Sequence, residues 1–302
     1  MSTFNIKKIL VPIDFSEAGE KAINQAVYVA RMNNASITLL HVIDSPANTY
    51  GPDYLGASRE FRVEFETMLK NNLTEKMEAL KNRITKEGIT DVEYFIESGK
   101  VYKKIIQVAE ETKTDIIMMG THGVSGVKEF FVGSNTFKVV GKSKHPVLSF
   151  QQKARENGFS DILVPFRDKD HGREGVEYAI QMAKIYGAVI HLLGINGDPD
   201  KEALKKMQFE AEQTKEIIKK RGVKCTVDVL TGNYFASLIL SFAENKKADM
   251  IVMVSDLDRM GLSEYLIGPV AQQIVNHSPI PVLSIRPAYV PSVINQANPM
   301  TY

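Results

Sequence analysis

The residues best suited to chemistry form a glycine loop late in the first half of the chain. After a short apolar run come Gly120 and Gly123, and then Gly133 followed at once by Ser134, which gives the spacing Gly-x2-Gly-x9-Gly-Ser. Glycine has no Cβ, so its backbone amide can approach a phosphate closely. Ser134 also begins a predicted helix, where free N–H groups and the positive end of the helix dipole favour an anion. The loop is therefore predicted to hold phosphate.

Two common nucleotide-binding motifs do not account for these glycines. A Walker loop needs Gly-x4-Gly-Lys followed by Ser or Thr, and this pattern is absent. The dinucleotide fingerprint should follow the first strand, where Pro12 to Ser16 contains no glycine. Glycines after a strand also occur in ordinary turns, but the order of strand, glycines, gap, Gly-Ser and helix is more specific.

The chain is a duplication. Residues 9–12 and 162–165 both read Ile-Leu-Val-Pro, and the register between the halves holds without a gap to Val42. Residues 146–149 are repeated as residues 281–284. We therefore expect two domains, at 1–150 and 159–286, joined by a polar linker and followed by a tail at 287–302. Further identities in this register pair Gly19 with Gly172, Ala26 with Ala179, Ala30 with Ala183, Ala35 with Ala188, and Leu39-Leu40 with Leu192-Leu193.

Each half alternates strands and helices. Strands flanked by helices imply a parallel sheet with right-handed crossovers. The predicted fold is therefore α/β, with two tandem, open, Rossmann-like domains of five parallel strands each. In the first half the predicted strands are Ile9–Ile13, Ile37–Ile43, Val92–Ile96, Asp115–Met119 and Pro146–Phe150. The predicted helices follow Ser16 as N-cap, span Val101–Glu111 and Gly133–Lys142, and include a long segment closing at Gly88 with Phe65, Leu69, Leu73, Met77, Leu80 and Ile84 on one face.

Composition limits the classes of partner. The 302 residues carry 37 Lys+Arg against 36 Asp+Glu, so bulk charge gives no reason to expect nucleic acid or an anionic membrane. Cys225 is the single cysteine, which excludes an internal disulfide and a cysteine metal cluster. The sequence shows neither a secretory signal nor an apolar run of membrane-spanning length. A cytoplasmic location is expected.

These motifs resemble a known family. With Ile-Leu-Val-Pro-Ile-Asp14 opening the domain and Leu-Leu-His-Val42 ending the second strand, the glycine loop closely resembles the ATP-binding class of the universal stress protein family. The likeness covers residues 4–150 well and 159–286 more loosely. It implies a fold like that of the adenine nucleotide alpha hydrolases, with ATP at the carboxyl ends of the strands.

The resemblance also implies a role for each group of site residues. The Asp14 carboxylate would accept a hydrogen bond from a ribose hydroxyl, and backbone groups of Val42 would meet the adenine edge. Amides of the glycine loop, with two hydroxyls, would hold phosphates neutralised by Mg²⁺. For His122, contact with a phosphate and exposure to solvent both remain open. The residues expected to bind nucleotide are Pro12, Asp14, Val42, Gly120, His122, Gly123, Gly133, Ser134, Asn135 and Thr136.

The resemblance further implies how the halves associate. The family usually pairs its last strands in a dimer. A tandem chain could make the same pairing internally, with Val147–Phe150 against Val282–Ile285. Whether two chains associate further is left open.

The second half departs from the motif. Asp14 aligns with Arg167, which cannot accept a hydrogen bond. Gly133-Ser134 becomes Gly268-Pro269, which loses an amide donor and a hydroxyl. Asp256 and Asp258 stand where phosphate would lie. We expect no ATP at this position of the second domain.

The leading hypothesis is a stress-response module that binds ATP in its first domain and senses or signals. The sequence offers no nucleophile beside a base and no acid/base pair, so an enzyme is not expected. One alternative is an adenine-nucleotide-dependent hydrolase or adenylating enzyme, which would need a pyrophosphate loop near strand one. Another is an interaction protein that binds no nucleotide.

Overall fold

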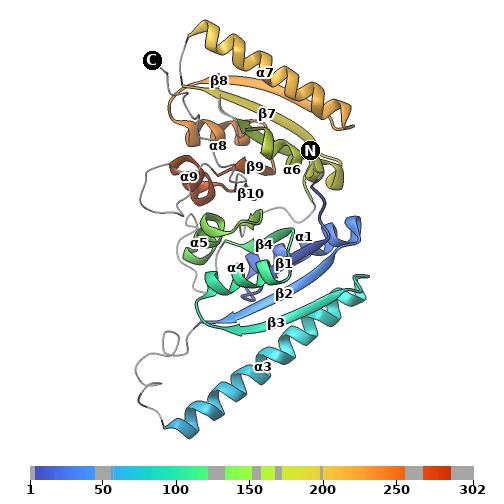
Figure 1. The fold of residues 1–302 in the computed structure, drawn as a ribbon, viewed down its shortest axis with the longest axis vertical. Helices are drawn as coiled ribbons and strands as arrows, with labels where there is room; N and C mark the ends of the chain where they lie inside the picture. Colours follow the sequence, from blue (N-terminus) through green and yellow to red (C-terminus); the bar gives the residue numbers. More distant parts are fainter. Residues whose placement is uncertain are drawn as a thin grey trace, which may run out of the picture.

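A single sheet runs through both halves of the protein. The computed structural model describes residues 4–44, 56, 58–121, 133–151, 158–166, 172–197, 200–255 and 268–286, with backbone alone for 172–174. Its ten strands lie in the order β3-β2-β1-β4-β5-β10-β9-β6-β7-β8, with helices on both faces (Figure 1).

The first half contains five strands and four described helices. Along the chain they are β1 (Lys8–Pro12), α1 (Glu17–Asn33), β2 (Ser36–Ile43), α3 (Arg59–Lys86), β3 (Val92–Ser98), α4 (Val101–Glu111), β4 (Ile116–Gly120), α5 (Ser134–Lys142) and β5 (Val147–Phe150).

The second half repeats this plan. Its elements are β6 (Asp161–Phe166), α6 (Gly172–Tyr186), β7 (Val189–Asn196), α7 (Lys201–Lys220), β8 (Cys225–Thr231), α8 (Phe235–Asn245), β9 (Met250–Val254), α9 (Pro269–His277) and β10 (Val282–Ile285).

Within each half the strands are parallel, and the first strand is central. β1 pairs with β2 on one side and with β4 on the other, and β6 pairs in the same way with β7 and β9. In the first half the chain therefore passes from β1 outward to β2 and β3. It then returns to the other side of β1 to form β4 and β5. The predicted α/β architecture of five parallel strands per half is confirmed.

The two halves meet through their last strands. β5 and β10 are antiparallel, and the register places Leu148 opposite Leu283. Both side chains are fully buried. The Ser149 hydroxyl donates to the Val282 carbonyl across the junction at 3.2 Å. The predicted pairing within the chain is confirmed, and it makes the sheet continuous.

Helices α1 and α6 add a second junction. The Tyr28 and Tyr186 rings are stacked, with centroids 5.0 Å apart. The Tyr186 hydroxyl donates to Gln25 Oε1 at 2.9 Å, and Gln25 is buried while Tyr186 is half-buried. Burial raises the pKa of the Tyr186 phenol, which keeps it protonated as the donor.

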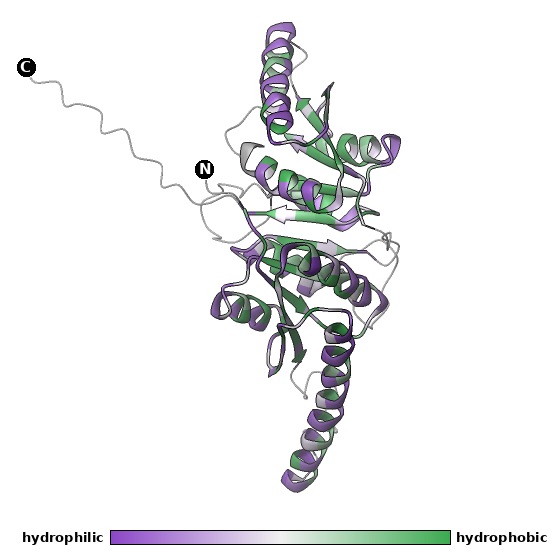
Figure 2. Ribbon diagram, turned by 90° about the vertical axis from the view of Figure 1, so that its right-hand side faces the viewer, coloured by the Kyte–Doolittle hydropathy of each residue, from purple (hydrophilic) through white to green (hydrophobic). Residues whose placement is uncertain are grey.

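Apolar side chains form one core on each face of the sheet. Helices α1, α3, α6 and α7 enclose one core, and α4, α5, α8 and α9 enclose the other. Figure 2 shows the strands mostly apolar and the outer sides of the helices mostly polar. Strands buried on both faces explain why apolar residues run continuously rather than alternating.

The same carboxylate contact fixes the amino ends of the central strands in both halves. Asp115 accepts from the backbone amides of Lys7 and Lys8 at 2.7 and 2.8 Å. Asp249 accepts from the amides of Ser160 and Asp161 at 2.8 and 3.0 Å. Both halves make this contact, so it belongs to the shared fold rather than to the first half alone.

Helix α3 differs from its predicted packing. It ends at C-cap Glu87, and Gly88 follows with a φ of +96°, as expected for a glycine stop. The predicted apolar stripe is buried only from Leu73 onward, whereas Phe65 and Leu69 are half-buried. In the part of the chain that the structure describes, none of the helices combines the length and apolar character needed to cross a membrane.

Truncation at the strand junction tests the continuous sheet. Leu283→Ala would leave a cavity opposite Leu148, so we expect the free energy of unfolding to fall by about 2–5 kcal/mol. Urea denaturation measures this change. Ile217→Ala, at a 48% exposed position on α7, serves as the control and should change stability little. Equal effects of the two substitutions would contradict the junction.

Candidate functional site

The sheet reverses its winding between β1 and β4. β1 leads outward to β2 and β3, whereas β4 lies on its other side and leads to β5. In open α/β sheets, ligands bind in the crevice outside the carboxyl ends of strands at such a reversal. Pro12 ends β1 and Gly120 ends β4. The topology therefore brings the Asp14 turn and the glycine loop to the same edge.

Local hydrogen bonds orient the Asp14 carboxylate. Asp14 Oδ1 accepts from the Ser16 amide at 3.0 Å and from the Ser16 hydroxyl at 2.6 Å. Ser16 Oγ in turn accepts from the Gly19 amide at 3.1 Å, which makes Ser16 the N-cap of α1. Both bonds to Asp14 use Oδ1. The arrangement holds a half-buried carboxylate in place and leaves Oδ2 outside this network.

His41 fixes the backbone just before Asp14. His41 Nδ1 lies 2.8 Å from the Ile13 carbonyl oxygen, and the Ile13 amide donates to Leu40 at 2.7 Å. A carbonyl can only accept, so Nδ1 carries the proton. Burial lowers the pKa of His41, although the Ile13 hydrogen bond and the Asp14 charge act in the opposite direction. Neutral His41 thus anchors the end of β1 to β2.

Gly120 allows the backbone at the end of β4 to contact the backbone at the start of α1. A Cβ on Gly120 would lie 2.8 Å from the Ala18 carbonyl carbon and 2.8 Å from the Gly19 amide nitrogen. Such distances are too short for any side chain, so the end of β4 can pack on the start of α1 only if residue 120 is glycine. This contact draws the Asp14 turn toward the glycine loop.

Gly133 makes a second close approach. Its amide donates to the Thr121 carbonyl at 2.6 Å, and a Cβ on Gly133 would lie 2.9 Å from the same oxygen. Gly133 is the N-cap of α5 and contributes no side chain to cap the helix. The amides of Ser134, Asn135 and Thr136 are the first-turn donors that an α-helix leaves without an intrahelical acceptor.

The side chains of the first turn of α5 differ in position. Ser134 is exposed and Asn135 is half-buried, whereas Thr136 is buried. The Thr136 hydroxyl donates to the Gly120 carbonyl at 2.9 Å, so its only proton is already used within the protein. Thr136 therefore ties α5 to the end of β4.

The remaining predicted residues lie at the same edge or outside the described structure. Pro12 is half-buried at the end of β1. Val42 is half-buried near the end of β2 and packs against the core on the α4 and α5 face. His122 and Gly123 lie outside the described residues.

The sequence prediction missed some residues at this edge. A Cβ on Gly19 would lie 2.7 Å from Asp14 Oδ1, so this glycine allows the carboxylate to sit against α1. The Thr121 carbonyl receives the Gly133 amide, and the Thr121 amide donates to Phe150 at 2.8 Å. The repetition of Gly19 as Gly172 was the available signal for the first of these.

In the second half, a valine occupies the position that Gly120 has in the first half. The strand pairing places Val254 where the first half has Gly120, since Val254 pairs with Ile285 as Gly120 pairs with Phe150. Space for the valine comes from Gly175, whose Cβ would lie 3.3 Å from Val254 Cγ2. Arg167 was expected to remove the ribose acceptor, and Asp256 and Asp258 were expected where phosphate would lie. All three lie outside the described residues.

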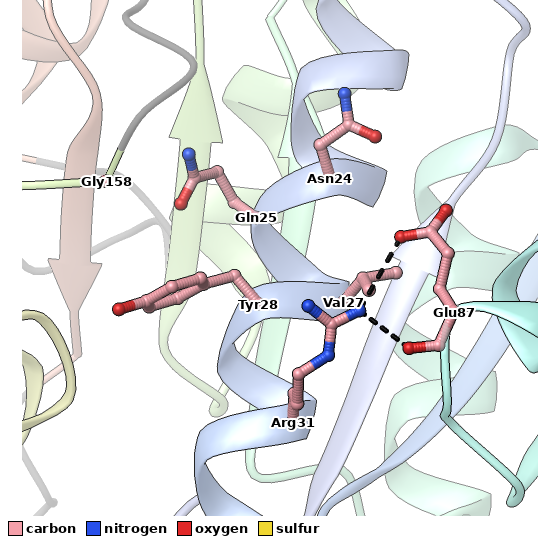
Figure 3. Close-up of a pocket in the computed structure, with 7 residues that line it drawn as sticks. All are labelled: Asn24, Gln25, Val27, Tyr28, Arg31, Glu87 and Gly158. Atoms are coloured by element: carbon pink, nitrogen blue, oxygen red, sulfur yellow. Dashed lines mark hydrogen bonds and ion pairs between the residues drawn. The ribbon is translucent and has the colours of Figure 1, made fainter.

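A separate hollow of about 350 Å³ lies beside α1. Asn24, Gln25, Val27, Tyr28 and Arg31 line it, together with Glu87 and Gly158 (Figure 3). Arg31 spans it and donates to the Glu87 carbonyl at 2.6 Å. This hollow contains none of the residues predicted for nucleotide. Within the described ranges, no cluster of three or more His, Cys, Asp or Glu could hold a metal ion.

Comparison with known proteins decides the family. A model of the universal stress protein family matches residues 5–150 and again residues 158–286. The chain belongs to the universal stress protein family. It carries two tandem copies of the family domain.

Two relatives illustrate this membership. A universal stress protein of Methanocaldococcus jannaschii is 38% identical over 159 residues, which are 49% of this chain and 96% of that protein. The crystal structure of a universal stress protein from Archaeoglobus fulgidus covers 92% of this chain and 98% of its own, with a TM-score of 0.72 and 23% identity. The second comparison concerns the fold of the whole tandem chain.

The backbone contact at Gly120 can be tested by adding a methyl group. Gly120→Ala would force the start of α1 away from β4, and we expect a loss of about 1–3 kcal/mol in the free energy of unfolding. Thermal or urea unfolding measures it. Gly56→Ala is the matched control, because a Cβ there meets nothing within 4 Å. A neutral Gly120→Ala would show that the contact is not required.

The protonation of His41 gives a pH prediction. Its pKa is lowered in the folded state, so its contribution to stability is complete above its ordinary pKa of 6.5 and is lost as the pH falls. His41→Asn keeps an N–H donor for Ile13 but does not titrate. Between about pH 7.5 and pH 5.5 we expect this variant to lose less stability than wild type. Identical losses in the two proteins, measured by urea unfolding, would contradict the assignment.

Proposed function

We propose that the first domain binds ATP at the carboxyl ends of β1, β2 and β4, and that the protein is a cytoplasmic stress-response sensor or signalling module. The observation that carries this proposal is the convergence of three segments at the reversal of the sheet. The Asp14 turn, the end of β4 and the start of α5 are held together by close contacts at Gly120 and Gly133.

The start of α5 supports the phosphate end of the proposed site. The Ser134, Asn135 and Thr136 amides belong to the uncapped first turn of a helix, and the helix dipole adds partial positive charge there. Ser134 is exposed, so its hydroxyl can also donate to a phosphate oxygen. Gly123 and His122 complete the proposed loop, and Thr136 serves it as a positioning residue through Gly120.

The Asp14 turn supports the ribose end. Its carboxylate is oriented through Oδ1 and offers Oδ2 to a ribose hydroxyl. Pro12 would line the ribose, and backbone groups of Val42 would meet the adenine edge. Mg²⁺ would bind through the phosphates and neutralise their charge.

The second domain is proposed to leave the equivalent position without nucleotide. Pro269 is the first residue of α9, where it supplies neither an amide proton nor a hydroxyl. Val254 adds a side chain where the first domain has Gly120. One nucleotide per chain is therefore the expected stoichiometry.

The site favours binding over fast turnover. Asp14 is the carboxylate at the edge of β1, and Ser16 uses it as a hydrogen-bond acceptor within the α1 cap. His41, its titratable neighbour, is committed to the Ile13 carbonyl. An adenylating enzyme is the competing function, and sustained ATP turnover near 1 s⁻¹ or faster would favour it.

Copying one feature of the second domain into the first provides a sharp test. Gly133 has φ −57° and ψ 144°, and Gly268 before Pro269 has φ −56° and ψ 151°. Ser134→Pro is therefore compatible with the backbone and with the first position of a helix. It removes the amide donor, so we expect ATP affinity to fall at least about tenfold in calorimetric titration.

Ser134→Ala is the matched control, since it removes the hydroxyl and keeps the amide. We expect a smaller loss than for Ser134→Pro. Unfolding curves verify that both variants fold. Equal ATP affinity in wild type and Ser134→Pro would contradict the proposed phosphate site. Failure of folded wild-type protein to bind ATP would favour an interaction protein without nucleotide.

A further inference from the structure

Phe15 has a backbone conformation that an aromatic residue does not favour. Its φ is +59°, in the left-handed region that glycine and asparagine enter far more readily. It stands between Asp14 and Ser16 in the turn that leads from β1 to α1. The other described non-glycine residues with positive φ all follow helices, at Asn34, Lys113 and Lys247. Phe15 precedes its helix, so a helix end does not explain its conformation.

The positive φ of Phe15 shapes the Asp14 turn. The chain reverses there, so that the Ser16 amide and hydroxyl both donate to Asp14 Oδ1, at 3.0 and 2.6 Å. An Asp side chain that accepts from the amide two residues on forms an Asx turn, and the residue between them sets the shape of that turn. The conformation of Phe15 therefore fixes the direction of the Asp14 carboxylate.

The Phe15 ring contacts two other elements of the first half. Its centroid lies 5.4 Å from that of the His41 ring on β2, with the planes tilted by 39°. Lys76 Nζ, on α3, lies over the ring at 5.6 Å from its centroid. Aromatic and cation–π pairs at these distances attract. Phe15 is 44% exposed and lies outside both apolar cores of the described residues, so the contacts with His41 and Lys76 offset its backbone strain.

His41 fixes the chain on both sides of Asp14. Its Nδ1 lies 2.8 Å from the Ile13 carbonyl oxygen, one residue before Asp14, and its ring contacts Phe15, one residue after. The backbone that carries the carboxylate is thus attached twice to the same residue of β2. Between these attachments, Oδ1 is held in the turn and Oδ2 faces outside this network.

The second half has none of these side chains at the aligned positions. In the register between the halves, the positions of Asp14, Phe15 and His41 all change. The aligned residues are Arg167, Asp168 and Gly194. Gly194 leaves no room for an imidazole, since a Cβ there would already lie 3.0 Å from Met207 Cγ. The aromatic ring and the imidazole therefore occur in the half that has the carboxylate and are absent from the half that lacks it.

We propose that Phe15 is a positioning residue for ribose recognition, whose ring, held by His41 and Lys76, keeps the Asp14 carboxylate directed at a ribose hydroxyl. This role rests on the proposed ATP site. Phe15 acts through Asp14, so it affects only the part of the ligand that Asp14 binds. Loss of the ring should weaken the binding of ATP but not that of an analogue without ribose hydroxyls.

The first test compares ATP with 2′,3′-dideoxy-ATP, which lacks both ribose hydroxyls, by calorimetric titration of the full chain. In wild type, the hydrogen bond to the carboxylate should make ATP bind about tenfold more tightly than the analogue. Phe15→Gly and Phe15→Asn accept a positive φ but lack the ring. Each should reduce the preference for ATP at least about threefold and leave the affinity for the analogue nearly unchanged.

Three further variants calibrate this comparison. Phe15→Tyr keeps the ring and should keep the wild-type preference. Asp14→Ala removes the acceptor and should make the two affinities nearly equal. Phe209→Ala removes a 64% exposed ring from α7 in the second half and should change neither affinity. Unfolding curves show that each variant is folded.

The second test measures the coupling between Phe15 and His41. His41→Asn keeps an N–H donor for Ile13 but lacks the ring that contacts Phe15. Because the two rings make one contact, the double variant Phe15→Gly/His41→Asn should lose little more preference for ATP than the stronger of the two single variants. Losses that multiply in the double variant would overturn the joint action of the two rings.

The outcomes separate this role from the proposed function. An unchanged preference in both Phe15→Gly and Phe15→Asn overturns the positioning role and leaves the ATP site standing. Equal losses of affinity for ATP and the analogue also overturn it, because they would make Phe15 a structural residue alone. A wild type that binds neither nucleotide, or binds both equally, overturns the ribose assignment of Asp14 and the role of Phe15 together.

Discussion

The contact between the end of β4 and the start of α1 is the constraint on which the candidate site depends. Backbone atoms of residues 18 and 19 lie where a Cβ of residue 120 would be. The Asp14 carboxylate belongs to the cap of α1, and the Thr136 hydroxyl binds the Gly120 carbonyl. Through Gly120, the Asp14 turn and the start of α5 are therefore held together.

The second half shows that the fold itself does not need this glycine. There Val254 replaces it, and Gly175 in α6 provides the room. The sheet order, the carboxylate contact at Asp249 and the helix layers are unchanged. The same sheet order forms with Gly120 in the first half and Val254 in the second. Gly120 therefore reflects a local requirement at the end of β4 rather than a requirement of the architecture.

The sequence predicted the elements better than their contacts. Helix α4 begins and ends where predicted, and the β5–β10 pairing was expected from the family resemblance. Periodicity could not show how much of α3 the core covers, so Leu69 was predicted on the same face as Leu73 and Met77 but is half-buried, whereas those two are buried. A hydroxyl at the start of a helix looks like a phosphate ligand in sequence, but only the structure shows that Thr136 donates to Gly120.

The starts of α5 and α9 show that one N–H donor can be lost at the first position of a helix without a loss of helix hydrogen bonds. Proline at the first position of a helix removes an N–H that has no intrahelical acceptor, so α9 can begin at Pro269 without losing a helix hydrogen bond. Serine at the same position of α5 keeps that N–H available to an anion. Since the glycines before these two residues have nearly the same backbone angles, the two helix starts differ in donors and not in backbone shape. The second half can thus share the sheet and complete the β5–β10 junction although α9 begins with one N–H donor fewer than α5.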